Sequence, residues 1–175
     1  LTELSNSKKK IYTNITFVDI AGLVKGASKG EGLGNKFLSH IREVDAIVHL
    51  VRCFESDKVT HVNSKINPVD DLETIKTEII LSDLDIIQKK LEKGKKKLLG
   101  EKEIKILEDK LKQLNDGKEV SVNDKAEEKF LTTLGLLSIK PKIIVCNVDE
   151  ESLAKGNTFT EDVKKNYSEE KVVTI

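Results

Sequence analysis

An acidic residue and a glycine stand three positions apart where an apolar run ends. The run Ile15–Ile20 is rich in β-branched and aromatic residues, as strands are, and it holds Asp19 and precedes Gly22. A carboxylate at the end of a strand can hold Mg²⁺ through water, and the backbone N–H of a following glycine can contact a terminal phosphate. The pair therefore predicts a phosphate site. A strand-ending turn with a solvated carboxylate is the alternative interpretation.

The residues around this pair extend the pattern over most of the chain. Asp19 is followed by the glycine-studded segment Gly22–Asn35, and further motifs lie at Val51–Phe54, Asn67–Pro68 and Cys146–Glu150. Together they resemble the Obg-like ATPases, the ribosome-associated branch of the Obg group of P-loop NTPases. The resemblance implies an ATPase with ATP as substrate, Mg²⁺ as cofactor and the ribosome as partner. It also implies that Asp19 is the Mg²⁺ ligand, through water, and that Gly22 contacts the nucleotide.

The turn Asn147–Glu150 bears on which purine is bound. In GTPases the corresponding motif is Asn-Lys-x-Asp, in which the aspartate accepts both guanine N–H groups and the lysine stem lies over the base. Here Val148 replaces the lysine and Glu150 the aspartate, and the longer carboxylate arm misplaces that bidentate contact. We predict that guanine preference is lost, with Asn147 kept as a polar anchor for the base. The resemblance implies ATP over GTP, and a plain strand-to-loop turn is the alternative.

A catalytic histidine is expected on similar grounds. Leu23 occupies the position where Ras-type enzymes carry the glutamine that orients the attacking water, and an aliphatic side chain cannot hydrogen-bond water. The resemblance implies that a histidine in the loop after the next strand replaces it, which matches His61. Histidine can accept or orient a proton near neutral pH, so His61 is the predicted catalytic residue, against an ordinary loop histidine. His40 and His49 are expected to be structural.

Two further segments have a functional and an ordinary interpretation. The segment Gly22–Gly34 is dense in glycine, which suits a switch ordered by the γ-phosphate, and a surface loop is the alternative. The span Lys89–Lys105 carries eight lysines and three acids. It could meet ribosomal RNA phosphates by counterion release, although it has no aromatic residue for base stacking. A solvated helix surface is the alternative for this lysine-rich span.

Hydrophobic periodicity predicts alternating strands and helices. We expect strands at 11–20, 44–51, 142–146 and 171–175, and helices at 35–43, 67 to the mid-90s, 104–117, 124 to just before Pro141, and 160–167. Asn67 and Pro68 form a helix start, and Asp124 caps a later helix with Glu127 as its capping-box partner.

The predicted fold class is α/β, an incomplete Ras-like P-loop NTPase (G domain) sheet with an inserted antiparallel α-helical hairpin. Residues 1–66 would be the first part of the nucleotide-binding domain, including its switch II region. Residues 67–139 would be the inserted helical hairpin or coiled-coil region. Residues 140–175 would be the second part of the nucleotide-binding domain.

The phosphate-cradling motif Gly-x-x-x-x-Gly-Lys-[Ser/Thr] does not occur in these 175 residues. We therefore expect a central fragment of a longer protein, without the Walker A segment and the C-terminal TGS domain of the resembling family. Alone it should bind nucleotide weakly and leave sheet edges unpaired. A non-catalytic RNA- or ribosome-binding helical adaptor and an Obg-group GTPase are the alternative functions.

Composition favours a cytoplasmic protein with no membrane partner. Lysine plus arginine and aspartate plus glutamate each number 30, so the net charge favours no partner class. The apolar runs are far shorter than a membrane span, and the first ten residues do not form a signal peptide. Cys53 and Cys146 lack metal-ligand spacing, and we expect both to be buried free thiols.

Overall fold

The strands of the described chain form one three-stranded parallel sheet. The computed structural model describes residues 5, 8–9, 12–19, 33–56, 66–94 and 99–175. The strands are β1 (Ile47–Arg52), β2 (Lys142–Asn147) and β3 (Lys171–Thr174), in the spatial order β1-β2-β3. Ile47 pairs with Lys142, and Ile143 pairs with Lys171. Because all three strands are parallel, their carboxyl ends meet at one edge of the sheet.

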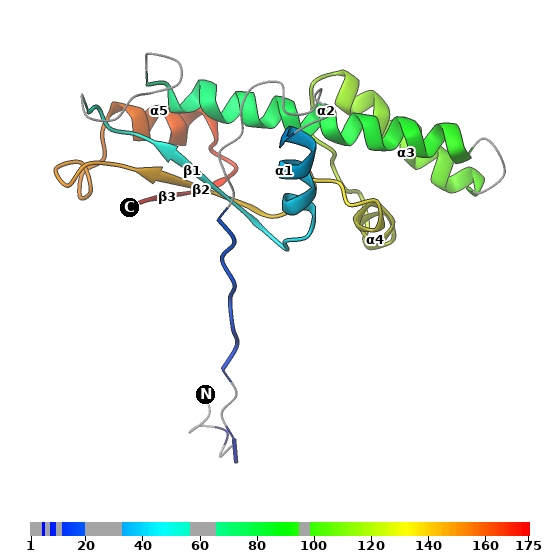
Figure 1. Cartoon of the computed structure of the whole chain (residues 1–175), viewed down its shortest axis with the longest axis horizontal. Helices are drawn as coiled ribbons and strands as arrows, with labels where there is room; N and C mark the ends of the chain where they lie inside the picture. Colours follow the sequence, from blue (N-terminus) through cyan, green and yellow to red (C-terminus); the bar gives the residue numbers. More distant parts are fainter. Residues whose placement is uncertain (1–4, 6–7, 10–11, 20–32, 57–65, 95–98) are drawn as a thin grey trace.

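Five helices connect and cover these strands in the described part of the chain. They are α1 (Leu33–Arg42), α2 (Pro68–Gly94), α3 (Glu101–Asn115), α4 (Lys125–Thr133) and α5 (Thr158–Asn166). In Figure 1, α2 and α5 lie along one face of the sheet, and α3 runs back along the outer half of α2. The α/β sheet with an inserted antiparallel helical hairpin is confirmed. None of the described helices combines the length and apolar character needed to cross a membrane.

Helix α2 serves both the sheet and the hairpin. It begins as its sequence predicts, since Pro68 is its first residue and the Asn67 side chain accepts a hydrogen bond from the backbone N–H of Asp70 (3.3 Å). Near its start, Leu72 packs in the sheet core with Val51 and Ile144. Its later residues leave the sheet and enter a different cluster. One continuous helix therefore joins the two packing units.

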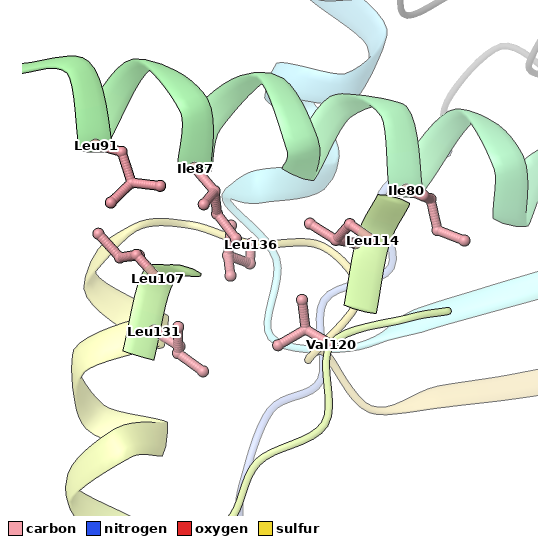
Figure 2. Packing of buried hydrophobic residues seen from close by; sticks show 8 residues of the cluster. All are labelled: Ile80, Ile87, Leu91, Leu107, Leu114, Val120, Leu131 and Leu136. Atoms are coloured by element: carbon pink, nitrogen blue, oxygen red, sulfur yellow. The ribbon is translucent and has the colours of Figure 1, made fainter. Parts of the chain in front are cut away.

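The second cluster holds the hairpin together (Figure 2). Its buried members are Ile80, Ile87, Leu91, Leu107, Leu114, Val120, Leu131 and Leu136. They come from α2, α3, α4 and the segments on either side of α4. Since burial of each such side chain contributes about 1.5–3 kcal/mol, this apolar cluster stabilises the hairpin separately from the sheet.

A buried polar joint fastens α1 to the hairpin base. The Asp83 carboxylate, fully buried in α2, accepts hydrogen bonds from the backbone N–H groups of Leu137 (2.9 Å) and Ser138 (2.8 Å) and from the Ser138 hydroxyl (2.6 Å). Arg42, the last residue of α1, lies 3.7 Å from Asp83 and donates to the carbonyl of Gly135 and the hydroxyl of Ser82. The helix that follows the glycine-rich segment is thus tied to α2.

The expected strand at 11–20 is wrong for the residues that the structure describes. Residues 12–19 are extended but pair with no strand, and in Figure 1 they run away from the sheet. The side chains of Ile15 and Phe17 are 77% and 83% exposed. A β-rich composition specifies a strand only where a partner edge and a packing surface are present. β1 is an edge strand of the described sheet.

The capping-box role of Glu127 and the helix end at Pro141 are also wrong. Asp124 does cap α4, accepting from the N–H groups of Ala126 and Glu127 at 2.8 Å each. The Glu127 carboxylate instead forms an ion pair with Lys110, because that buried ammonium offers a stronger partner than the cap N–H. Helix α4 ends at Thr133, since Gly135 adopts φ +68° and turns the chain well before the proline.

Candidate nucleotide-binding site

Backbone hydrogen bonds join the carboxyl ends of the three strands. The N–H of Cys53, just after β1, donates to the carbonyl of Asn147 at the end of β2 (2.7 Å). The N–H of Val148 donates to the carbonyl of Ile175 after β3 (3.1 Å), and the N–H of Ile175 donates to the carbonyl of Cys146 (3.0 Å). Ligands of open parallel sheets bind at this edge, so its rigidity bears on any site built there.

The turn Asn147–Glu150, which the sequence predicts to contact the purine and which we call the purine-reading turn, lies at this edge. Val148 is half-buried and packs against the sheet core, whereas Glu150 is exposed and makes no side-chain hydrogen bond with the described residues. Asp149 points back into the turn, where its carboxylate accepts from the N–H of Ser152 (2.8 Å). Hydrogen bonds from the Ser152 hydroxyl and N–H lower the pKa of Asp149. The turn therefore holds the Asp149 carboxylate in place and leaves the Glu150 carboxylate exposed.

A seven-residue loop, residues 151–157, connects this turn to α5. Its last residue, Asn157, caps α5 by accepting from the N–H of Thr160 (3.0 Å). The same side chain donates through Nδ2 to the carbonyl of Cys53 (2.7 Å) and to the Ser152 hydroxyl (3.3 Å). Sequence reasoning missed Asn157 and Ser152. The pattern Asn-Thr before a helix could have identified the cap, but not the contact with a residue 104 positions away.

The loop after β1 is anchored by Arg52. Its Nε donates to the carbonyl of Phe54 (3.0 Å), a terminal nitrogen donates to the carbonyl of Ser56 (3.2 Å), and its guanidinium lies 4.8 Å from the centre of the Phe54 ring. This loop leads toward His61, which lies outside the described residues. Sequence reasoning missed Arg52 as well. The side chain fixes the start of the segment that holds the predicted catalytic histidine.

The structure does not bring Asp19 to the purine-reading turn. Asp19 is exposed, and its extended segment has no partner strand in the described sheet. Gly22, Leu23 and the rest of the predicted switch up to residue 32 lie outside the described residues. The roles of Asp19 and Gly22 therefore stay predictions. Within the described part of the chain, no three histidine, cysteine or acidic side chains cluster as metal ligands.

The other histidines and the cysteines lie in structural positions. His40 is exposed on α1, and His49 lies within β1 with its Nε2 buried and without a partner among the described residues. Burial, together with nearby Lys142, lowers the pKa of His49 to about 4, so the ring is neutral near pH 7. Cys53 and Cys146 are buried free thiols, as expected.

The described lysines of the span Lys89–Lys105 lie on the last turns of α2 and the first turns of α3. Lys89, Lys93, Lys102 and Lys105 are exposed, Lys90 is half-buried, and residues 95–98 lie outside the described part. Lys89 forms an ion pair with Asp85 (2.7 Å) one turn earlier. The described lysines are thus carried on two packed helices, together with the exposed acids Glu92 and Glu101.

Comparison with known proteins identifies relatives along the whole chain. Residues 2–83 match a family described as 50S ribosome-binding GTPase. The chain is 42% identical to the ribosome-binding ATPase YchF of Escherichia coli O157:H7 over 182 aligned residues, covering all of this chain and 50% of that protein. It is 47% identical to the ribosome-binding ATPase YchF of Bacillus subtilis over 163 residues, covering 88% of this chain and 44% of that protein.

A solved structure agrees with these matches. The YchF GTPase of Schizosaccharomyces pombe superposes with a TM-score of 0.71 at 30% sequence identity, covering 87% of this chain and 45% of that one. The chain therefore spans about half the length of the curated relatives it matches. The yeast protein is named a GTPase and the bacterial relatives are named ATPases, so these relatives differ in the purine that their names imply.

Proposed function

We propose, from the premise that this chain is a homologue of the YchF proteins of the Obg family, that it is part of an ATP-binding and ATP-hydrolysing switch protein that associates with ribosomes. The observation that carries the proposal is the purine-reading turn, held at the carboxyl edge of a parallel sheet with Glu150 free and exposed. A ribosomal partner would place the protein in the cytoplasm. The ribosome-binding ATPase names of the bacterial relatives support the same assignment.

The turn favours adenine over guanine for a chemical reason. Guanine recognition needs a carboxylate that accepts from N1–H and the 2-amino group together, and adenine offers neither donor. The extra methylene of Glu150 displaces its oxygens from that geometry, and Val148, packed on the sheet core, supplies no lysine stem over the base. A site that loses a pair of guanine hydrogen bonds loses about 1–3 kcal/mol of preference for GTP.

The phosphate end of the site would use residues upstream. Asp19 presents an exposed carboxylate that bonds no described residue, and an anionic oxygen is the donor that Mg²⁺ prefers. We place Mg²⁺ there through water, with the Gly22 amide facing the terminal phosphate and His61 orienting the attacking water. The metal would neutralise phosphate charge, and the protein groups would position the reactants.

The proposal is tested by changing the purine-reading turn in the full-length gene product. The double variant Val148→Lys, Glu150→Asp restores the guanine-reading pattern, and the expected result is a rise in GTP affinity relative to ATP of about tenfold. Fluorescent-nucleotide titration with both purines measures it. A wild-type protein that binds GTP more tightly than ATP would overturn our interpretation of Glu150.

Ribosome association can be tested at the described lysines of the span Lys89–Lys105. The variant Lys93→Ala, Lys102→Ala, Lys105→Ala should weaken co-sedimentation with ribosomes and make binding less dependent on salt, because fewer counterions are released. Lys164→Ala, Lys165→Ala removes two exposed charges from α5 and serves as the control. Equal binding by both variants would mean that ribosomes contact another surface.

A further inference from the structure

The purine-reading turn and the start of α5 are fastened to a single residue, Cys53. Its N–H donates to the carbonyl of Asn147 (2.7 Å), and its carbonyl accepts from Nδ2 of Asn157 (2.7 Å). Cys53 is fully buried in the sheet core and immediately follows β1. Both ends of the loop between Asn147 and Asn157 therefore bond to the backbone of one buried residue.

The interior of this loop is held by the same amide. Nδ2 of Asn157 also lies 3.3 Å from the Ser152 hydroxyl, and the N–H of Ser152 binds the Asp149 carboxylate (2.8 Å). A further bond, from the N–H of Gly156 to the carbonyl of Ser152 (2.7 Å), closes the turn. Glu150 lies next to the pinned Asp149, so its position relative to the sheet depends on this chain of bonds.

The capping role of Asn157 does not require these contacts. An N-cap needs only a side-chain acceptor for an N–H in the first turn, and Oδ1 provides it for Thr160. Serine or aspartate would cap equally well but has no donor that can reach Cys53 as the amide does. The two Nδ2 bonds thus serve the loop and not the helix.

We infer that Asn157 is a positioning residue for purine selection, acting through Cys53 and Ser152 to hold the purine-reading turn in register with the sheet edge. This rests on the proposed function, since it concerns how the same nucleotide site discriminates bases. Without the Nδ2 donors the loop loses its bond to the Cys53 carbonyl, and the Glu150 carboxylate samples more positions. Base binding weakens and the difference between purines shrinks, because misplaced groups discriminate less.

The test uses Asn157→Ser in the full-length gene product, which keeps a capping oxygen and removes the amide. Titration with fluorescent ATP and GTP analogues should show an ATP dissociation constant raised about five- to tenfold, as expected when the loop loses both Nδ2 hydrogen bonds, and a smaller ratio between the two dissociation constants. In steady-state hydrolysis, KM should rise while kcat stays within about twofold, since the loss is in uniform binding.

The matched control is Asp124→Ser, a cap-to-serine change on α4, where the Asp124 side chain accepts capping bonds from the N–H groups of Ala126 and Glu127. It should leave both dissociation constants unchanged. If Asn157→Ser fails to fold, Ser152→Ala removes one of the two acceptors of Nδ2 and should raise the ATP dissociation constant about twofold.

The outcomes separate the inference from the proposal beneath it. A wild-type protein that prefers GTP would refute the proposed purine choice, yet Asn157→Ser would still be judged by the dissociation constant of whichever purine binds. If Asn157→Ser binds both purines with wild-type affinity and ratio, the inference fails while the proposed function stands. A loss of affinity shared equally by Asp124→Ser would also overturn it, because helix capping alone would then explain the effect.

Discussion

The buried ion pair between Lys110 and Glu127 should decide whether α4 stays docked on the hairpin. The Lys110 ammonium is fully buried and lies 2.6 Å from the Glu127 carboxylate, whose side chain is only 8% exposed. Asn123 donates to both carboxylate oxygens (3.2 and 3.0 Å), and Lys110 also contacts the half-exposed Asp109 at 3.0 Å. Burial disfavours both charges, yet their mutual hydrogen bonds raise the pKa of Lys110 and lower that of Glu127.

Lys110→Met should therefore release α4. The substitution keeps the length of the stem but leaves the Glu127 charge buried with Asn123 as its main remaining partner, and breaking one side of a buried pair costs about 3–5 kcal/mol. Hydrogen–deuterium exchange over residues 125–133 measures local opening, and at least 3 kcal/mol corresponds to about a 100-fold loss of protection. If the free energy of local opening of α4 in the wild type is smaller than this loss, protection should disappear entirely.

Two further variants test whether the buried, unpaired charge of Glu127 causes this loss of protection. Lys89→Met breaks an ion pair of similar length (2.7 Å) whose partners are 65% and 58% exposed. It should change the free energy of local opening of residues 125–133 by less than about 1 kcal/mol. Lys110→Met combined with Glu127→Leu removes both charges and should recover most of the lost protection. If Lys110→Met behaves like Lys89→Met, the pair does not hold α4. If the double variant exchanges as fast as the single one, charge burial is not the cause.

Three other predictions concern Glu127, Cys53 and His61. Because the folded pKa of Glu127 lies below its ordinary value of 4.5, its contribution is complete above that pH and is lost as the pH falls through the folded value. The melting temperature, measured by circular dichroism, should thus fall more steeply below about pH 4.5 in the wild type than in the variant Lys110→Met, Glu127→Leu. Burial, then the neighbouring Cys146, raises the pKa of Cys53 to about 12, so iodoacetamide at pH 8 should alkylate Cys53 only after unfolding. Peptide mass mapping decides this, and rapid labelling of the native protein would contradict it. His61→Ala should slow ATP turnover and leave ATP affinity within a few-fold, and unchanged turnover would remove His61 from the mechanism.

Local signals in the sequence predicted the helices and the paired strands well. The start of α2 follows from Asn67 and Pro68, whose capping oxygen and fixed φ act within one turn. The end of α3 follows from Gly117, which adopts φ +72°. Such features depend on neighbours a few residues away, so a single sequence contains all that is needed to find them.

Predictions failed where a distant partner competed with a local one. The sequence around Glu127 fits a capping box, but Lys110, on the preceding helix, offers a buried positive charge. The apolar run before Asp19 fits a strand, but a ladder needs a second edge, and residues 12–19 pair with none in the described sheet. In both cases the local sequence propensity described the residue itself and contained no information about its tertiary partners.

The candidate site likewise has a part that could be predicted from the sequence and a part that could not. The motif Asn147–Glu150 could be predicted from sequence because its chemistry lies in consecutive residues at the end of a strand. Its support could not, because the Cys53 carbonyl is an ordinary backbone group and only the parallel pairing of β1 with β2 brings it to Asn157. A backbone acceptor has no residue type to mark it, so no sequence motif could have identified this contact. The residues that we propose to read the purine were therefore identified from the sequence, whereas the hydrogen bonds that hold them depend on the fold.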